Sequence, residues 1–137
     1  MKETLDALES RRTEILHLLE QLGDFRPGMI SVNYRKCGKK NCVCARRGHP
    51  GHGPQYLWNS TFGGRSVAEN LPLGPRLEKT RKEVAGYESF LKLTRELVET
   101  NQKICRLRPT EEIQDEKELE ELKKKLQRHF WKKRVGK

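Results

Sequence analysis

Three cysteines and two histidines fall within one short stretch of this chain, and they constrain its fold more than any other feature. They are Cys37, Cys42, Cys44, His49 and His52. A closed structural zinc site takes four nitrogen or sulfur ligands in a tetrahedron, commonly three cysteines and one histidine. The stretch therefore predicts a structural zinc ion (Zn2+) held by the three cysteines and by either His52 or His49.

The residues between these ligands favour a metal loop. In an extended segment alternate side chains point the same way, so we expect Cys42 and Cys44 to reach one ion together. Glycines supply the positive-φ turns that a short metal loop needs, and this stretch contains Gly38, Gly48, Gly51 and Gly53. Free thiols, a redox pair and a catalytic thiol are the alternatives for the cysteines.

Positive charge surrounds the same stretch. Every charged residue from Arg26 to His52 is a lysine or an arginine, and the whole chain of 137 residues has a formal net charge of +10 at pH 7. We expect these cations to lower the thiol pKa values. A basic surface of this kind also points to nucleic acid, DNA before RNA, rather than to a membrane. The residues expected to contact nucleic acid are Arg35, Lys36, Lys39, Lys40, Arg46, Arg47 and Arg65.

An N-terminal helix is predicted over residues 2–23. Its apolar side chains recur with heptad spacing, which is typical of an amphipathic helix that packs on another helix; they are Leu5, Leu8, Ile15, Leu19 and Leu22. The helix packs either on a later helix of the same chain or on a second copy, as in a coiled-coil homodimer. The pattern leaves both arrangements open.

Three segments in which apolar and polar residues alternate predict β-strands over residues 29–35, 55–61 and 65–71. A tight connection at Gly63-Gly64 joins the last two, which indicates a three-stranded antiparallel meander. The cysteine stretch then forms the long loop between the first two strands. Such a sheet is small enough to need a helix on one face.

Two helices are predicted after the sheet. Pro75 fits the first turn of a long helix that ends near Arg108, and Cys105 is expected to lie in its core-facing stripe as a small apolar residue. Thr110 is expected to cap a last, highly charged helix that runs to about Trp131.

The predicted fold class is therefore α+β: an N-terminal helix, a small three-stranded sheet with a zinc-knuckle loop, and long C-terminal helices. The expected parts are residues 1–25, 26–73, 74–108 and 109–137, the last with a basic tail, in one compact domain with helical extensions. No apolar run is long enough to cross a membrane and no export signal is visible. We accordingly expect a cytoplasmic protein whose cysteines stay reduced.

The motif C-G-K-x-x-C-x-C followed by G-H-G-P resembles a family of small, uncharacterised prokaryotic proteins. Here it consists of Cys37-Gly38-Lys39, Cys42, Cys44 and Gly51-His52-Gly53-Pro54, and the similarity extends from about Gly28 to Leu107. Members are often encoded beside transposases, so the resemblance implies a mobile-element setting but no reaction. It favours His52 over His49 as the fourth ligand, because His52 stands in the G-H-G-P position. Where the family tends to have a run of tyrosines, this chain has Gln55-Tyr56-Leu57-Trp58.

Together these observations predict a zinc-stabilised nucleic-acid-binding accessory protein of a mobile element. The alternative is a protein–protein adaptor or dimerising helical module that docks a transposase or nuclease, with the zinc purely structural. An enzyme is not expected. Metal-dependent catalysis on nucleic acid needs clustered carboxylates for Mg2+, and the sequence places none beside the basic stretch.

Overall fold

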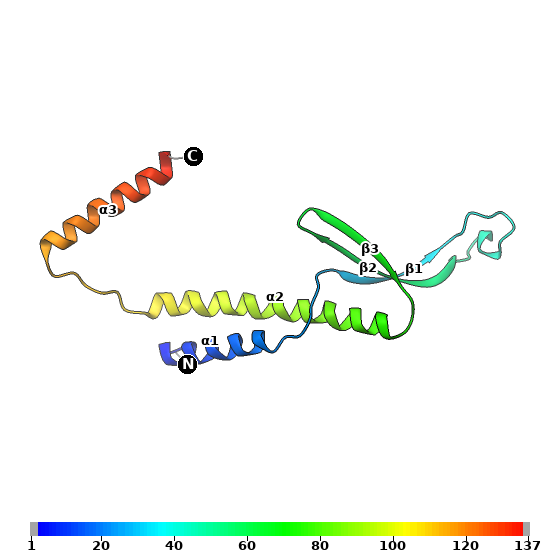
Figure 1. Cartoon of the computed structure of the whole chain (residues 1–137), viewed down its shortest axis with the longest axis horizontal. Helices are drawn as coiled ribbons and strands as arrows, with labels where there is room; N and C mark the ends of the chain where they lie inside the picture. Colours follow the sequence, from blue (N-terminus) through cyan, green and yellow to red (C-terminus); the bar gives the residue numbers. More distant parts are fainter. Residues whose placement is uncertain (1–2, 136–137) are drawn as a thin grey trace. The chain divides into compact units, whose positions relative to one another are not determined.

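The computed structural model describes residues 3–135, with side chains as far as residue 132 (Figure 1). The last two residues of the predicted basic tail, Gly136 and Lys137, lie outside the described residues. The chain divides into two compact units, Met1–Cys105 and Arg106–Lys137. The predicted α+β fold class is confirmed: helix α1 (Leu5–Glu20) precedes strands β1 (Met29–Arg35), β2 (His52–Phe62) and β3 (Arg65–Leu71), and the helices α2 (Pro75–Leu107) and α3 (Glu116–Val135) follow.

The sheet is an antiparallel meander with strand order β1-β2-β3. Ile30 lies opposite Trp58 in the first ladder, and Tyr56 lies opposite Leu71 in the second. The predicted bounds of β1 and β3 agree with the structure, whereas β2 begins at His52 rather than at residue 55. The ladder extends that far because Arg35 still pairs with His52 after a register shift that follows Asn33.

Helix α1 lies antiparallel to the C-terminal half of α2 in the first unit. Lys103 and Glu3 form an ion pair of 3.0 Å, Arg12 donates to the side-chain oxygen of Asn101 at 3.1 Å, and Arg11 pairs with Glu96. The buried side chains of the two helices include Leu8 and Ile15 on α1 and Thr100 and Ile104 on α2. Of the two packing partners that the heptad pattern left open, the structure shows the one within the same chain.

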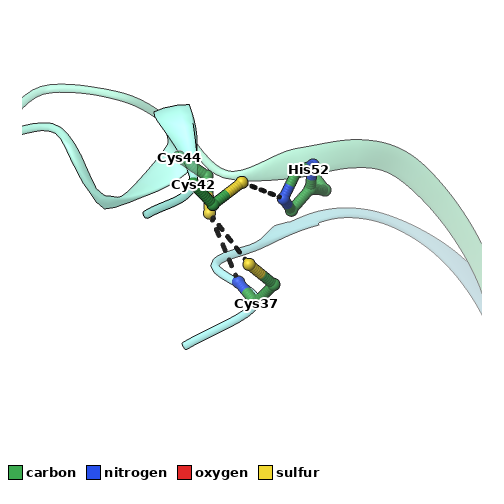
Figure 2. Close-up of side chains that lie close together, drawn as sticks. All are labelled: Cys37, Cys42, Cys44 and His52. Carbon is green, nitrogen blue, oxygen red and sulfur yellow. Dashed lines mark hydrogen bonds between the residues drawn. The ribbon is translucent and has the colours of Figure 1, made fainter. Parts of the chain in front are cut away.

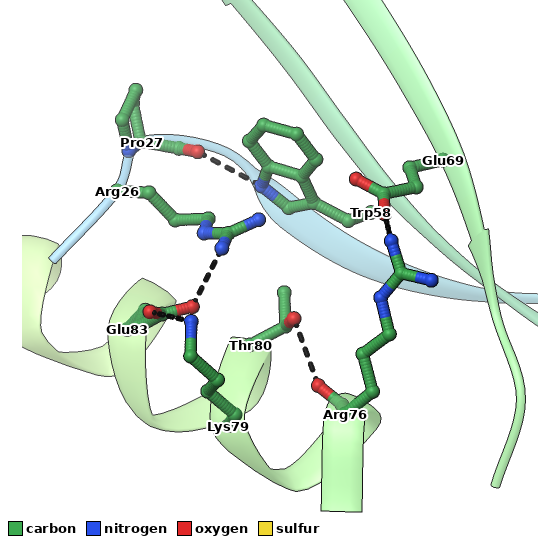
Figure 3. A network of polar contacts seen from close by, with 8 residues as sticks. All are labelled: Arg26, Pro27, Trp58, Glu69, Arg76, Lys79, Thr80 and Glu83. Atoms are coloured by element: carbon green, nitrogen blue, oxygen red, sulfur yellow. Dashed lines mark hydrogen bonds and ion pairs between the residues drawn. The ribbon is translucent and has the colours of Figure 1, made fainter.

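The sheet joins α2 through a cluster of polar groups around one buried carboxylate (Figure 3). Glu83 pairs with Arg26 at 2.8 Å and with Lys79 at 2.6 Å, and its side chain is only 10 % exposed. The Arg26 guanidinium also lies 4.7 Å above the Trp58 ring, whose Nε1 donates to the Pro27 carbonyl at 3.0 Å. Buried ionised groups persist where they are paired in this way. Glu83 therefore ties α2 to the segment that enters β1 and, through it, to β2.

Aromatic stacking holds the segment between α1 and β1 against the same helix. The Phe25 ring stacks on Phe90 and Tyr87, with centroid separations of 4.9 Å and 6.0 Å. Gly86 permits this approach, because a Cβ at that position would lie 3.1 Å from the Cβ of Phe25. A glycine in a helix interior costs about 1 kcal/mol relative to alanine, and the close packing of Phe25 accounts for its place here.

Three expectations for the helices are wrong. Helix α1 ends at Glu20 rather than at residue 23, and it begins at Leu5, where the Thr4 hydroxyl accepts a hydrogen bond from the Ala7 N–H at 3.1 Å and caps the helix. The last helix begins at Glu116 and not after Thr110, because the Asp115 carboxylate accepts a hydrogen bond from the Lys117 N–H at 3.0 Å and so supplies the N-terminal cap. Cys105 is exposed rather than packed in the core, while its neighbour Ile104 is buried. Among the described helices, none is both long enough and apolar enough to cross a membrane.

Replacing Glu83 by Gln is expected to destabilise the first unit by about 1–3 kcal/mol, because it leaves Arg26 and Lys79 without a charged partner at a buried site. Urea unfolding monitored by Trp fluorescence measures this change. Glu78→Gln is the matched control, since Glu78 pairs with Arg81 on the exposed face of the same helix and such pairs add little. Equal unfolding midpoints for the two variants would contradict the role given to Glu83.

The effect of Glu83→Gln is also expected to depend on pH. The hydrogen bond from Lys79 lowers the pKa of Glu83, burial opposes the shift, and the charge of Arg26 adds to the lowering. A carboxylate whose folded pKa lies below its unfolded value, about 4.3, stabilises the fold fully above that value. The difference in unfolding free energy between the wild type and the variant should therefore be constant near neutrality. It should shrink toward zero as the pH falls through the folded pKa.

Candidate metal centre

The cysteine loop is closed by the end of the first ladder. Arg35 of β1 pairs with His52 of β2, so Cys37 and His52 emerge side by side where residues 36–51 leave the sheet. Gly51 allows the two backbone segments, before β2 and at the end of β1, to lie close together. It has a φ of +105°, and a Cβ there would lie 2.6 Å from the backbone carbonyl carbon of Arg35. Only glycine combines this backbone conformation with so little space.

Successive turns fold the rest of the loop back toward that point. The Cys42 N–H donates to the Lys39 carbonyl at 3.3 Å, and the Ala45 N–H donates to the Cys42 carbonyl at 3.0 Å. Residues Val43–Ala45 form a short 3-10 helix, η1, which carries the buried Cys44. The expectation that Cys42 and Cys44 lie in an extended segment is therefore wrong. A tight helical turn, not strand alternation, brings both sulfurs to one place.

Four side chains converge at the base of the loop (Figure 2). The ligand atoms of Cys37, Cys42, Cys44 and His52 all lie within 4.8 Å of one another, and this group can hold a metal ion. Cys37 Sγ is 3.5 Å from Cys44 Sγ, and Cys42 Sγ is 3.1 Å from His52 Nε2. Tetrahedral zinc, with bonds of about 2.3 Å to sulfur and about 2.0 Å to nitrogen, places two sulfurs about 3.8 Å apart and sulfur and nitrogen about 3.5 Å apart. The donor set suits such an ion, and the two short separations lie within about 0.4 Å of these values.

His49, the other candidate for the fourth ligand, has a different role. Its Nδ1 accepts a hydrogen bond from the Gly51 N–H at 3.0 Å, and among the described residues it is not part of the four-residue group. His49 thus stabilises the turn that leads into Gly51-His52. No carboxylate of the described chain belongs to the group either.

The pKa values of Cys37 and Cys44 are shifted in opposite directions, that of Cys37 downward and that of Cys44 upward. The backbone N–H of Lys39 lowers the pKa of Cys37 to about 6, and hydrogen bonds with the His52 ring and the Cys44 thiol add to the effect. For Cys44, the Cys37 backbone N–H lowers the pKa, but burial and the neighbouring thiols outweigh it and raise the pKa above its ordinary value. The cause of the Cys37 shift differs from the expectation, because a backbone donor rather than a cationic side chain dominates.

Six of the seven predicted nucleic-acid contacts surround this group on exposed positions. They are Arg35, Lys36, Lys39, Lys40, Arg46 and Arg47, called the loop cations below. Arg65 lies elsewhere: it starts β3 and pairs with Phe62 at the far end of β2. Phe62 follows His52 by ten residue positions along β2, roughly 30 Å at the usual rise. The structure therefore does not place Arg65 with the loop cations.

Sequence reasoning missed two contributors to the site. The Lys39 backbone N–H acts on Cys37, and the ring nitrogen of His49 binds the Gly51 N–H. Both are short-range backbone contacts. The available signal was the glycine at position 38 and the proline at position 50, which mark turns but do not say which groups the turns bring together.

Comparison with known protein families places this site within one family model. A family described as a domain of unknown function (DUF6788) matches residues 5–82, more than half of the chain. The chain belongs to this family. No curated protein and no solved structure matches it.

The DUF6788 match includes α1, the whole sheet, the metal group and all loop cations, and it ends within α2. The family is uncharacterised, in agreement with the resemblance seen in the sequence, but its bounds differ. The match begins before the sheet, at residue 5, and stops at residue 82. Helix α3 lies outside it.

Replacing Cys44 by Ser is expected to abolish metal binding. Cys44 is the buried member of the group, so a water molecule cannot take the place of its sulfur as a ligand. The wild type should retain about one metal ion per chain after gel filtration, as expected for a closed four-ligand site, and elemental analysis by plasma mass spectrometry measures it. The loop should then become sensitive to trypsin at its lysines and arginines. Cys105→Ser removes an exposed cysteine outside the group and is the matched control.

The histidines allow a second comparison within the same experiment. His52→Ala should lower the retained metal as Cys44→Ser does, whereas His49→Ala should leave the metal content near that of the wild type. Full metal content in His52→Ala, or loss of metal only in His49→Ala, would show that the fourth ligand has been assigned to the wrong ring.

Proposed function

We propose that this protein binds nucleic acid, with DNA preferred to RNA, through a cationic loop that a structural zinc ion holds in shape. The observation that carries the proposal is the state of the loop cations. Within the described residues, no hydrogen bond or ion pair engages any of their side chains. The nearest carboxylates along the chain are Asp24 and Glu69, outside the loop on either side.

Several cations elsewhere in the chain have carboxylate partners: Arg26 pairs with Glu83, Arg76 with Glu69 and Lys103 with Glu3. Other helix cations, such as Lys82 and Lys92, have no ion pair in the described chain, but glutamates stand close to them in the sequence, which is not so for the loop cations. Charges that lie together without counter-charges repel one another, and a folded loop that keeps them together is suited to a polyanion. Phosphates of nucleic acid supply that counter-charge and release bound counterions.

Zinc is the metal we propose for the four-residue group. Three thiolates and one imidazole are soft and borderline ligands that suit zinc in a closed tetrahedral site, whereas Mg2+ and Ca2+ prefer oxygen. All four positions are filled by protein, which supports a structural role. The zinc would fix the backbone from Lys36 to Gly51, and the loop cations would then project from a rigid frame. The proposal includes no catalytic step.

A setting beside a transposase completes the proposal. It is supported by the C-G-K-x-x-C-x-C and G-H-G-P motifs through the resemblance described above. A small DNA-binding protein with a three-stranded sheet and an exposed cationic loop suits an accessory role, in which it would mark or hold DNA for an enzyme.

Lys39→Glu combined with Lys40→Glu is expected to weaken binding to all duplex sequences alike, by about tenfold or more at low salt. The slope of log affinity against log salt should become shallower by about two, because each lost phosphate contact removes roughly one unit. Fluorescence anisotropy with labelled duplex DNA at several salt concentrations measures both quantities.

The control for this experiment changes the same amount of charge elsewhere. Lys82→Glu combined with Lys92→Glu alters two exposed lysines on α2 and should reduce affinity far less. Equal losses in the two double variants would mean that net charge, and not the loop, governs binding.

A second candidate function is a protein–protein adaptor. It is favoured by apolar side chains that stay uncovered on the α1–α2 pair, among them Leu16, Leu91 and Val98. A hollow of about 410 Å3 lies on the same pair of helices and is lined by Leu18, Gln21, Leu22, Ser89, Lys92 and Leu93. An exposed apolar surface of this kind is suited to a helix of a partner, such as a transposase or nuclease, or of a second copy.

Light scattering of the purified protein separates this candidate from the first. A mass above that of one chain, or a protein that co-purifies in fixed ratio, would support it. A strict monomer over a wide concentration range, without a co-purifying protein, would contradict it and leave nucleic-acid binding alone.

A further inference from the structure

A hollow of about 290 Å3 opens on the surface of the loop between β1 and β2 that carries the candidate metal group. It is lined by Lys40, Asn41, Cys42, Val43, Ala45 and Arg46. Cys42 belongs both to this lining and to the candidate metal group, so the hollow directly adjoins that group. Ligand pockets in proteins begin at about 300 Å3, and this one is therefore of a size for a single small ring system.

The walls of the hollow are fixed by the same contacts that shape the loop. The Ala45 N–H donates to the Cys42 carbonyl at 3.0 Å, and the Arg46 N–H donates to the Val43 carbonyl at 3.1 Å. A metal held by Cys42 and Cys44 would secure the lining from behind. The hollow should thus keep its shape only in the metal-loaded protein.

The lining offers three kinds of chemistry within one turn of chain. Lys40 and Arg46 supply positive charge without carboxylate partners in the described chain. The Asn41 side chain has both donors and an acceptor, and it is exposed with no hydrogen bond to another described residue. Val43 presents an apolar surface that is 58 % exposed. A flat ring with a polar edge and an attached phosphate matches all three.

We propose that this hollow takes one unpaired nucleotide of a nucleic-acid ligand, with Asn41 on the edge of the base, Val43 against its face, and Lys40 and Arg46 on the flanking phosphates. The proposal rests on the proposed nucleic-acid-binding function and names the part of the ligand that the loop holds. The base must be unpaired, because a base stacked inside a duplex cannot enter a concave site, whereas a splayed base presents both its edge and its face.

The test compares two labelled DNA duplexes that differ by one unpaired nucleotide at the centre, with full-length, zinc-loaded protein. The phosphate number is nearly the same, so the salt-dependent part of the affinity is matched. The wild type should bind the bulged duplex about tenfold more tightly, the size of effect that one or two net hydrogen bonds to the base would give. Asn41→Ala should lose this preference while its affinity for the paired duplex and its zinc content stay unchanged.

Asn70→Ala is the matched control, because Asn70 is exposed on β3 and outside the hollow; it should keep the preference. Equal affinity of the wild type for the two duplexes would overturn the hollow as a nucleotide site and leave the proposed function intact if binding stays salt-sensitive. A preference that survives in Asn41→Ala would overturn it as well. Failure to bind either duplex would remove both proposals.

Discussion

The convergence of three thiols and one imidazole is the constraint on which the loop depends. Between Lys36 and Gly51 the structure buries almost nothing: Cys44 and Gly51 are the buried residues of that segment, and Val43 points its apolar side chain to solvent. A loop without a core of its own needs another source of order, and small domains often use a metal for that purpose. The group of Cys37, Cys42, Cys44 and His52 lies where such a metal would act.

The pairing of charges differs between the helices and the loop. Several cations on and around the helices pair with glutamates, and Glu83 pairs with two of them where the sheet meets α2. The loop cations have no such partners in the described chain. Like charges gathered on one loop cost free energy in the isolated protein. In the proposed function, metal binding would offset that cost in the free protein, and phosphates would relieve the repulsion on binding.

Much of this could be predicted from local sequence. The bounds of β1 and β3 follow from alternating side chains and from the Gly63-Gly64 turn. Residue chemistry indicates the three cysteines of the candidate metal group but left His49 and His52 open, and the choice of His52 came from the family resemblance. The geometry of the loop could not be predicted, because the sequence around Cys44 is compatible with both a 3-10 turn and an extended segment. Helix α3 shows a similar limit: Thr110 and Asp115 are both good N-terminal caps, and only the structure shows that Asp115 is the one used. The position of Arg65 depends on strand length and register, which composition does not reveal.

We propose that a metal orders the loop into a surface for nucleic acid, and a single titration tests this proposal. Zinc-loaded wild-type protein and the same protein after chelation are titrated against one labelled duplex at about 50 mM and about 200 mM salt. We expect the zinc-loaded protein to bind the duplex with an affinity that falls as salt is raised, and the chelated protein to bind it at least about tenfold more weakly. Equal affinities with and without metal, or no binding by the loaded protein at low salt, would contradict it.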